Sequence, residues 1–105
     1  MITLLKRSVL FVSVLGLTFP VLADRAVFEQ QCAGCHMPDA SGNPALNAPN
    51  LTGLTQGYLS RQINNYRTGV RGSDPRDSGG AMMVAVVTAL SDEQVLSVSS
   101  FIAGL

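Results

Sequence analysis

Cysteine, histidine and tryptophan are scarce in this sequence. Its 105 residues include two cysteines, one histidine and no tryptophan. Two cysteines form at most one disulfide, which excludes a multi-disulfide scaffold. Three cysteine and histidine residues cannot supply the four ligands of a structural zinc site built from these residue types alone.

Charged residues are also few. They make up 13% of the chain, against 47% hydrophobic residues, which excludes a disordered, highly charged protein. The formal net charge is +0 and no basic run appears, so we expect no nucleic-acid partner. The length suits one domain rather than two.

The N-terminal segment has the pattern of an export signal. The basic pair Lys6 and Arg7 precedes an apolar run over 9–19, which ends at Pro20. A retained membrane anchor is the alternative, but a spanning helix needs about 20 apolar residues and this run is shorter. We therefore expect residues 1–23 to be a cleaved signal peptide.

Cleavage after Ala23 would leave residues 24–105 as the mature domain, with no membrane span. That domain has 105 less 23, or 82, residues, with five arginines, no lysine and seven acidic residues. A chain of this size is near the limit at which a hydrophobic core alone suffices, so we expect a staple or a cofactor. Export places it in the periplasm, where cysteines meet oxidising conditions.

The mature chain reads as helices separated by long loops. Apolar residues recur at helical spacing, a Ser-x-x-Gln capping box begins the last helix, and no alternating pattern indicates a strand. Glycine and proline concentrate in the loops. We expect helices over 26–35, from about Thr55 to Thr68 and from Ser91 onward, loops over 38–53 and 69–81, and either a helical turn or an extended piece over 84–87.

The chemistry is concentrated in Cys32-Ala33-Gly34-Cys35-His36. C-x-x-C-H is the pattern of c-type haem attachment, in which two thiols bind the haem covalently and the histidine binds its iron. C-x-x-C alone also suits a thiol–disulfide oxidoreductase, although that chemistry uses a βαβ framework that the chain does not indicate. A plain structural disulfide is the third interpretation. Export and a helical background favour one covalently attached haem c.

A haem held by His36 has a second axial position. Methionine there is typical of electron carriers, whereas an open position indicates ligand binding or catalysis. Met37 directly follows His36 and is therefore held on the histidine side. Met82 and Met83 follow the glycine-rich loop, and we predict that one of them is the second iron ligand.

Together these motifs make the chain similar to the class I cytochromes c. The resemblance is to the small bacterial periplasmic monohaem type and to single halves of dihaem relatives. It implies an all-α fold of three to four short helices and long loops around one haem. The matching segments are CAGCH (32–36), APNLTGL (48–54), YLSRQINNYRTGVR (58–71), MM…LSDEQ (82–94) and SSFIAGL (99–105).

The resemblance also implies roles for individual residues. The carbonyl of Pro49 would accept the Nδ1–H of His36. Met83, seven residues before Leu90, would be the iron ligand, with Met82 as the runner-up. The haem would be lined by Leu51, Leu54, Leu59 and Ile63, and its propionates would lie near Gln62, Arg67 and Arg71.

The function implied by the resemblance is electron transfer, not enzymatic catalysis. The protein would carry one electron between redox protein donors and acceptors, as a monomer or as a subunit of a redox complex. The alternative is a haem c electron-entry subunit of a larger dehydrogenase or oxidase complex. From the residues alone, a ligand-binding or catalytic haem protein and a haem-free thiol oxidoreductase also stay open.

Overall fold

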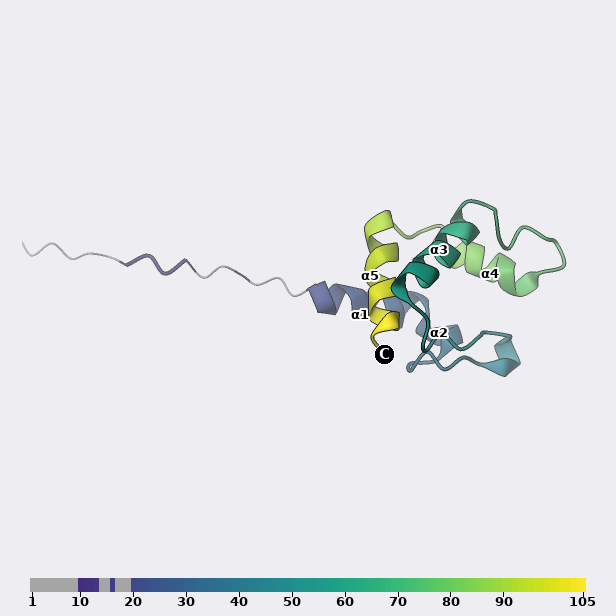
Figure 1. Cartoon of the computed structure of the whole chain (residues 1–105), viewed down its shortest axis with the longest axis horizontal. Helices are drawn as coiled ribbons and strands as arrows, with labels where there is room; N and C mark the ends of the chain where they lie inside the picture. The colour runs from purple at the N-terminus through teal and green to yellow at the C-terminus, as the bar shows by residue number, and fades with distance from the viewer. Residues whose placement is uncertain (1–9, 14–15, 17–19) are drawn as a thin grey trace, which may run out of the picture.

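A computed structural model describes residues 10–13, 16 and 20–105, and in these ranges the secondary structure is helical apart from one isolated bridge, Asn43 to Ala48. The all-α prediction is confirmed (Figure 1). The helices outnumber the predicted three to four because a short helix carries the C-x-x-C-H motif and a further one follows the second loop. They are α1 (Pro20–Gln31), α2 (Ala33–His36), the 3-10 helix η1 (Pro44–Leu46), α3 (Gln56–Arg67), α4 (Ser78–Val87) and α5 (Asp92–Ala103).

The predicted signal peptide, residues 1–23, falls mostly outside the described residues. The predicted cleavage point after Ala23 lies within α1, which begins at Pro20. Within the described part of the chain, no single helix is long and apolar enough to cross a membrane. The two helices α4 and α5 meet such a criterion only as a pair, bent by 117°.

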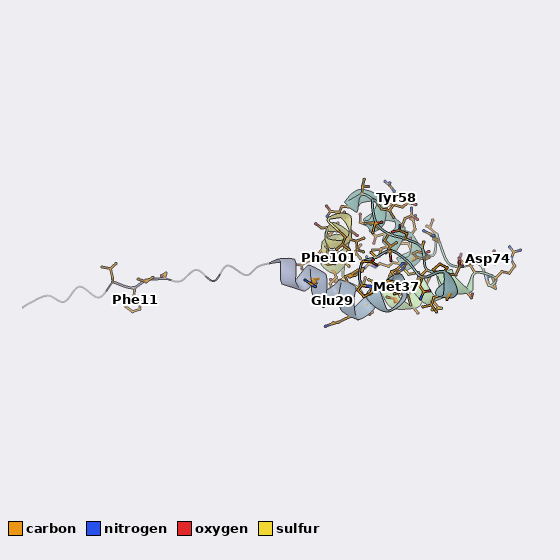
Figure 2. The ribbon with its side chains drawn as sticks, turned by 90° about the horizontal axis from the view of Figure 1, so that it is seen from below. Phe11, Glu29, Met37, Tyr58, Asp74 and Phe101 are labelled. Atoms are coloured by element: carbon orange, nitrogen blue, oxygen red, sulfur yellow. The ribbon has the colours of Figure 1, made fainter. Side chains whose placement is uncertain are left out.

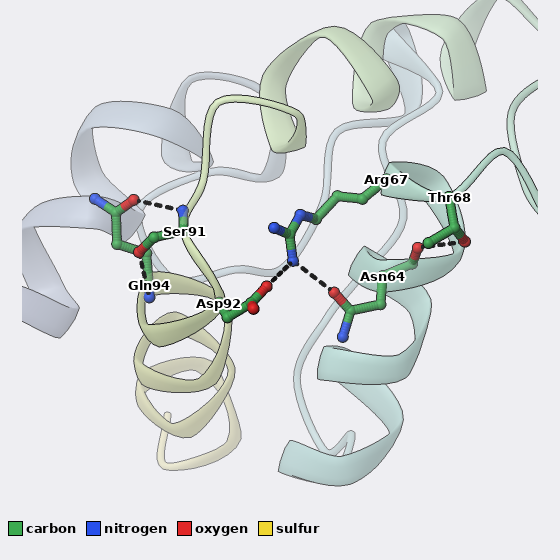
Figure 3. Close-up of polar contacts among 6 residues, drawn as sticks. All are labelled: Asn64, Arg67, Thr68, Ser91, Asp92 and Gln94. Atoms are coloured by element: carbon green, nitrogen blue, oxygen red, sulfur yellow. Dashed lines mark hydrogen bonds and ion pairs between the residues drawn. The ribbon is translucent and has the colours of Figure 1, made fainter.

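Local sequence signals set the ends of α3 and α5. The Thr55 hydroxyl accepts a hydrogen bond from the Tyr58 N–H at 3.2 Å and caps α3. Gly69, just beyond this helix, has a φ of 79°, which glycine adopts without strain. Ser91 and Gln94 form a reciprocal capping box at 3.1 and 2.9 Å (Figure 3). The predicted boundaries of α3 and the predicted start of α5 are confirmed.

The loop predicted over 69–81 is shorter than expected. The helix α4 begins at Ser78, and residues 84–87 form its last turn rather than an extended piece. Asp77 caps this helix, because its Oδ1 accepts the Gly80 N–H at 2.7 Å. Gly79 and Gly80 favour a loop by their intrinsic propensity. They are helical here because tertiary packing overrides propensity, and a side chain at position 80 would not fit.

Two small hydrophobic clusters hold the helices together. The Phe28 and Phe101 ring centres, 5.3 Å apart, join α1 to α5, which cross and pack against each other (Figure 1). Val27 and Ile63 pack against both clusters. The helix α5 also links the two clusters, because it contributes Val98 and Ile102 to the first and Val95 to the second. The first cluster comprises Phe28, Ala40, Leu59, Val98 and Ile102, and the second comprises Tyr66, Val87, Leu90 and Val95.

Candidate haem site

His36 is firmly anchored at the end of α2. Its side chain is buried, and its Nδ1 lies 2.9 Å from the carbonyl oxygen of Pro49. A carbonyl oxygen only accepts hydrogen bonds, so the proton of this contact belongs to Nδ1, and Nε2 is the ring nitrogen left for a metal. The contact with Pro49 thereby fixes the orientation of the imidazole.

The Pro49 carbonyl is held near His36 by a tight loop. The backbone N–H of Gly42 donates to the His36 carbonyl at 2.9 Å, and Asn43 and Ala48 exchange backbone hydrogen bonds at 2.8 and 3.0 Å. A Cβ atom at Gly42, whose φ is 90°, would lie 2.7 Å from the carbonyl carbon of Pro49. Glycine at this position therefore permits the close approach that fixes the imidazole.

Cys32 and Cys35 are half-buried free thiols on the wall of the same cavity as His36. The His36 N–H donates to the Cys32 carbonyl at 3.0 Å, so the motif forms one helical turn. Burial raises the pKa of the Cys32 thiol to about 11. Thiol–disulfide enzymes need a lowered thiol pKa, because the thiolate is the nucleophile. This site is therefore poorly suited to thiol exchange.

A cavity of about 600 Å³ opens beside the motif. Its volume lies within the range typical of small-molecule and cofactor sites. It brings together residues from the motif, the following loop, α3 and α4. Besides the motif, the predicted site residues that line it are Pro49, Leu51, Leu54, Leu59, Gln62, Ile63, Arg71, Met82 and Met83.

Both candidate methionine ligands line this cavity. Met82 is 54% exposed, whereas Met83 is half-buried and packs against the cluster that contains Tyr66 and Val87. The structure thus places His36 from α2 and both methionine side chains from α4 on one cavity. The packing of Met83 favours it over Met82 as a fixed ligand.

Arg67 is the one predicted site residue that does not line the cavity. Its Nη1 donates to Oδ1 of Asp92 and to Oδ1 of Asn64, each at 2.8 Å (Figure 3). These residues line a separate polar cleft of about 560 Å³ with Thr68 and Thr88. The Arg67 side chain therefore joins α3 to α5.

Arg71 does line the cavity, together with two residues that the sequence analysis did not single out as site residues. Its Nη1 donates to Gln62 Oε1 at 3.0 Å, and its guanidinium lies 4.7 Å from the ring centre of Tyr66. The pKa of Tyr66 is raised overall, mainly because the side chain is partly buried. The positive charge of Arg71 opposes this shift, and the negative charge of Asp77 adds to it. The helical spacing from Gln62 could have identified Tyr66, and the capping preference of aspartate before Ser-Gly-Gly could have identified Asp77.

These residues fit a c-type haem. The two thiols and the imidazole are next to each other, which matches covalent attachment and iron binding by one motif. Thioether groups stand on the same cavity, and a soft sulfur is a known axial ligand of haem iron. The aliphatic side chains of Leu51, Leu59 and Ile63 supply the apolar wall that a porphyrin ring needs.

The comparisons with known proteins agree with this site. The cytochrome c family model matches residues 24–105. Cytochrome c4 of Azotobacter vinelandii is 32% identical over 74 residues, covering 70% of this chain and 34% of the relative. A thiosulfate dehydrogenase electron acceptor of Stutzerimonas stutzeri (strain A1501) is 38% identical over 69 residues, covering 66% of this chain and 29% of the relative. Cytochrome c-554(548) of Halomonas halodenitrificans is 33% identical over 70 residues, covering 67% and 78%.

The chain spans about a third of the length of the cytochrome c4 that it matches. The family match, in contrast, extends over the whole described core from α2 to α5 and includes the C-x-x-C-H motif and the cavity beside it. The chain therefore belongs to the cytochrome c family, and Cys32, Cys35 and His36 are its motif for one covalently bound haem c.

Proposed function

We propose that this chain carries one electron at a time between redox proteins and catalyses no reaction of its own. When bound, the haem supplies an iron that is reversibly reduced and oxidised. The observation that carries the proposal is the shared cavity of His36 and the methionine pair Met82 and Met83. Two protein ligands leave no open position for a substrate, which separates a carrier from a catalytic haem protein.

In this proposal His36 and Met83 would be the two protein ligands that hold the iron. The Pro49 carbonyl keeps His36 in the tautomer whose Nε2 binds metal. A methionine sulfur favours the reduced iron and raises its potential. Met82 is the runner-up ligand.

The remaining cavity residues attach the haem and exclude water. Cys32 and Cys35 hold it through thioether bonds. Gln62 and Arg71, which are hydrogen-bonded to each other, would supply donors to the propionates. The apolar wall is supplied by Leu51, Leu54, Leu59 and Ile63. Arg67 is left out of this set, because its guanidinium is engaged by Asp92 and Asn64.

We place the mature protein in the periplasm, after removal of residues 1–23. The support is the basic pair before an apolar run of signal-peptide length. The intact mass of the purified protein tests this together with haem attachment. It should equal that of residues 24–105 plus one haem, and haem that is released into acidified organic solvent would contradict covalent attachment.

A second candidate is an electron-entry subunit of a larger dehydrogenase or oxidase complex. The similarity to a protein named thiosulfate dehydrogenase electron acceptor supports electron exchange with a dehydrogenase. Co-purification with a large enzyme from the native host favours the subunit, and isolation as a free monomer favours the carrier.

Replacing each methionine tests the axial ligation. We expect Met83→Ala to abolish the Met–iron charge-transfer band, to let the iron bind added imidazole, and to lower the potential by an amount on the order of tenths of a volt, within the roughly 0.8 V that axial ligands control. The matched control Met82→Ala should change little, because this exposed side chain repacks easily.

Two other outcomes are informative. If only Met82→Ala loses the band, the ligand assignment is reversed. If the double replacement keeps the wild-type spectrum, methionine is not the second ligand and the carrier proposal fails.

A further inference from the structure

We propose that Asp77 is the positioning residue for the methionine ligand, fixing the first turn of α4 and with it the sulfur of Met83. The inference rests on the proposed function, because Met83 needs a fixed position only if it binds the haem iron. Asp77 lies six residues before Met83 and is the N-cap of the helix that carries it.

Hydrogen bonds hold Asp77 from both sides. Its Oδ1 accepts the Gly80 N–H at 2.7 Å, and its carbonyl accepts the Ala81 N–H at 3.0 Å. Its own N–H donates to the carbonyl of Asp74 at 2.9 Å, which ties it to the preceding loop. Met83 follows Gly80 by less than one helical turn. A shift of the first turn of α4 therefore moves the Met83 side chain directly.

A contact between two glycines locks this turn against the loop. A Cβ atom on Gly72, whose φ is 81°, would lie 2.7 Å from the Gly80 carbonyl oxygen and 2.9 Å from both Tyr66 and Val84. A Cβ atom on Gly80 would lie 2.8 Å from the Gly72 Cα and would overlap the Asp77 carboxylate. The loop and the start of α4 thus meet backbone to backbone beside the Tyr66 side chain of α3, and only glycines fit there.

The carboxylate of Asp77 also bears on the charge of the site. Among the described residues that line the cavity, Asp77 is the only acid, and Arg71 is the only basic residue besides His36. A nearby negative charge stabilises the oxidised, more positive iron and so lowers the potential. The capping role and the charge of Asp77 are separable by substitution, because asparagine caps helices as well as aspartate does but carries no charge.

The experiment compares Asp77→Ala with Asp77→Asn in the haem-loaded protein. We expect Asp77→Ala to weaken the Met–iron band and to raise the affinity for imidazole about tenfold, since loss of a cap frees the turn. Asp77→Asn should keep the band and the wild-type imidazole affinity, while the potential shifts upward.

Two control variants match these changes. Ser91→Ala removes the cap of α5, which carries no ligand, and should lose stability without any change in imidazole affinity. Asp74→Asn removes a charge from the same loop, but Asp74 does not line the cavity and lies at the outer end of the loop, far from Phe101 (Figure 2). It should leave the potential unchanged.

A further variant is needed if Asp77→Ala does not fold into a haem-loaded protein. Gly72→Ala pushes on Gly80 from the loop side and leaves the Asp77 cap chemistry intact. It should also raise the imidazole affinity.

The inference is overturned if Asp77→Ala keeps the wild-type band and imidazole affinity, or if Asp77→Asn is as open to imidazole as Asp77→Ala. Failure of the proposed function looks different. In that case the wild-type protein itself lacks the Met–iron band, or Met83→Ala does not change it.

Discussion

At the scale of single residues, Met37 has a strained backbone conformation directly after the haem motif. Its φ of 73° and ψ of 156° lie in a region that is essentially reserved for glycine. The Met37 N–H donates to the Ala33 carbonyl at 3.0 Å, and its carbonyl accepts from Ala40, so the conformation is fixed from both sides. The strain follows His36 directly and is maintained by the surrounding loop.

We expect Met37→Gly to stabilise the haem-loaded protein by about 1 kcal/mol. Relief of strain contributes roughly 1–3 kcal/mol, and the greater chain entropy of glycine offsets roughly 0.5–1 kcal/mol of it. Little packing is lost, because Met37 is 39% exposed. Urea unfolding of the variant and the wild type measures the difference. Met37→Ala keeps the strain and serves as the control, so an equal gain in stability for alanine would refute the explanation.

The sequence alone does not decide which of two arginines near α3 lines the cavity. Arg67 and Arg71 have the same chemistry and lie four residues apart, so the resemblance assigned both to the propionates. The fold separates them, because Asp92 at the start of α5 engages Arg67 and leaves Arg71 on the cavity. The spacing of two residues along the chain does not reveal where α5 packs, so the sequence could not separate their roles.

At the scale of elements, the Arg67–Asp92 pair connects α3 to α5. The pair is 2.8 Å long, but the Asp92 side chain is 93% exposed, so solvent screens the attraction. Its contribution to stability is therefore modest, although it also places a negative charge at the N-terminus of α5.

We expect Arg67→Ala to lower the free energy of unfolding by about 0.5–1 kcal/mol and to leave the redox potential unchanged. Arg71→Ala is the matched comparison, and it should lower the potential because it removes a positive charge from the cavity. Thermal unfolding and a redox titration of both variants measure these effects. A shift in potential for Arg67→Ala alone would restore it to the propionate set.

The helices α3 and α5 were predictable from sequence, whereas the start of α4 was not. Thr55 and Ser91 are strong local caps followed by apolar residues at helical spacing, so local signals and the final packing agree. In the first turn of α4 the glycines at 79 and 80 indicate a loop by propensity. The contact of Gly80 with Gly72, a feature of the tertiary fold, decides in favour of helix.

At the scale of the whole molecule, the cavity lies between the two hydrophobic clusters rather than outside them. Leu59 and Val98 of the first cluster and Tyr66 and Leu90 of the second all line it. A haem bound in this cavity would therefore join two small cores into one. This accounts for a domain that carries few large apolar residues yet has a defined fold.

Folding should consequently depend on haem attachment. Helices of 10–12 residues, such as α3, α4 and α5, are marginal without tertiary packing. Without haem the cavity is open to solvent, so the apolar side chains of both clusters that line it are left in contact with water.

We therefore expect the haem-free variant Cys32→Ala/Cys35→Ala to lose most of its helical circular dichroism and its cooperative thermal transition. The haem-loaded wild type in the same buffer provides the reference. Each single cysteine replacement should retain one thioether bond and give an intermediate yield of folded protein, because one bond still holds the haem in the cavity. If the haem-free double variant melts cooperatively from a helical state, the two clusters alone are sufficient for folding. The haem would then bind to a core that is already formed and would not be needed to complete it.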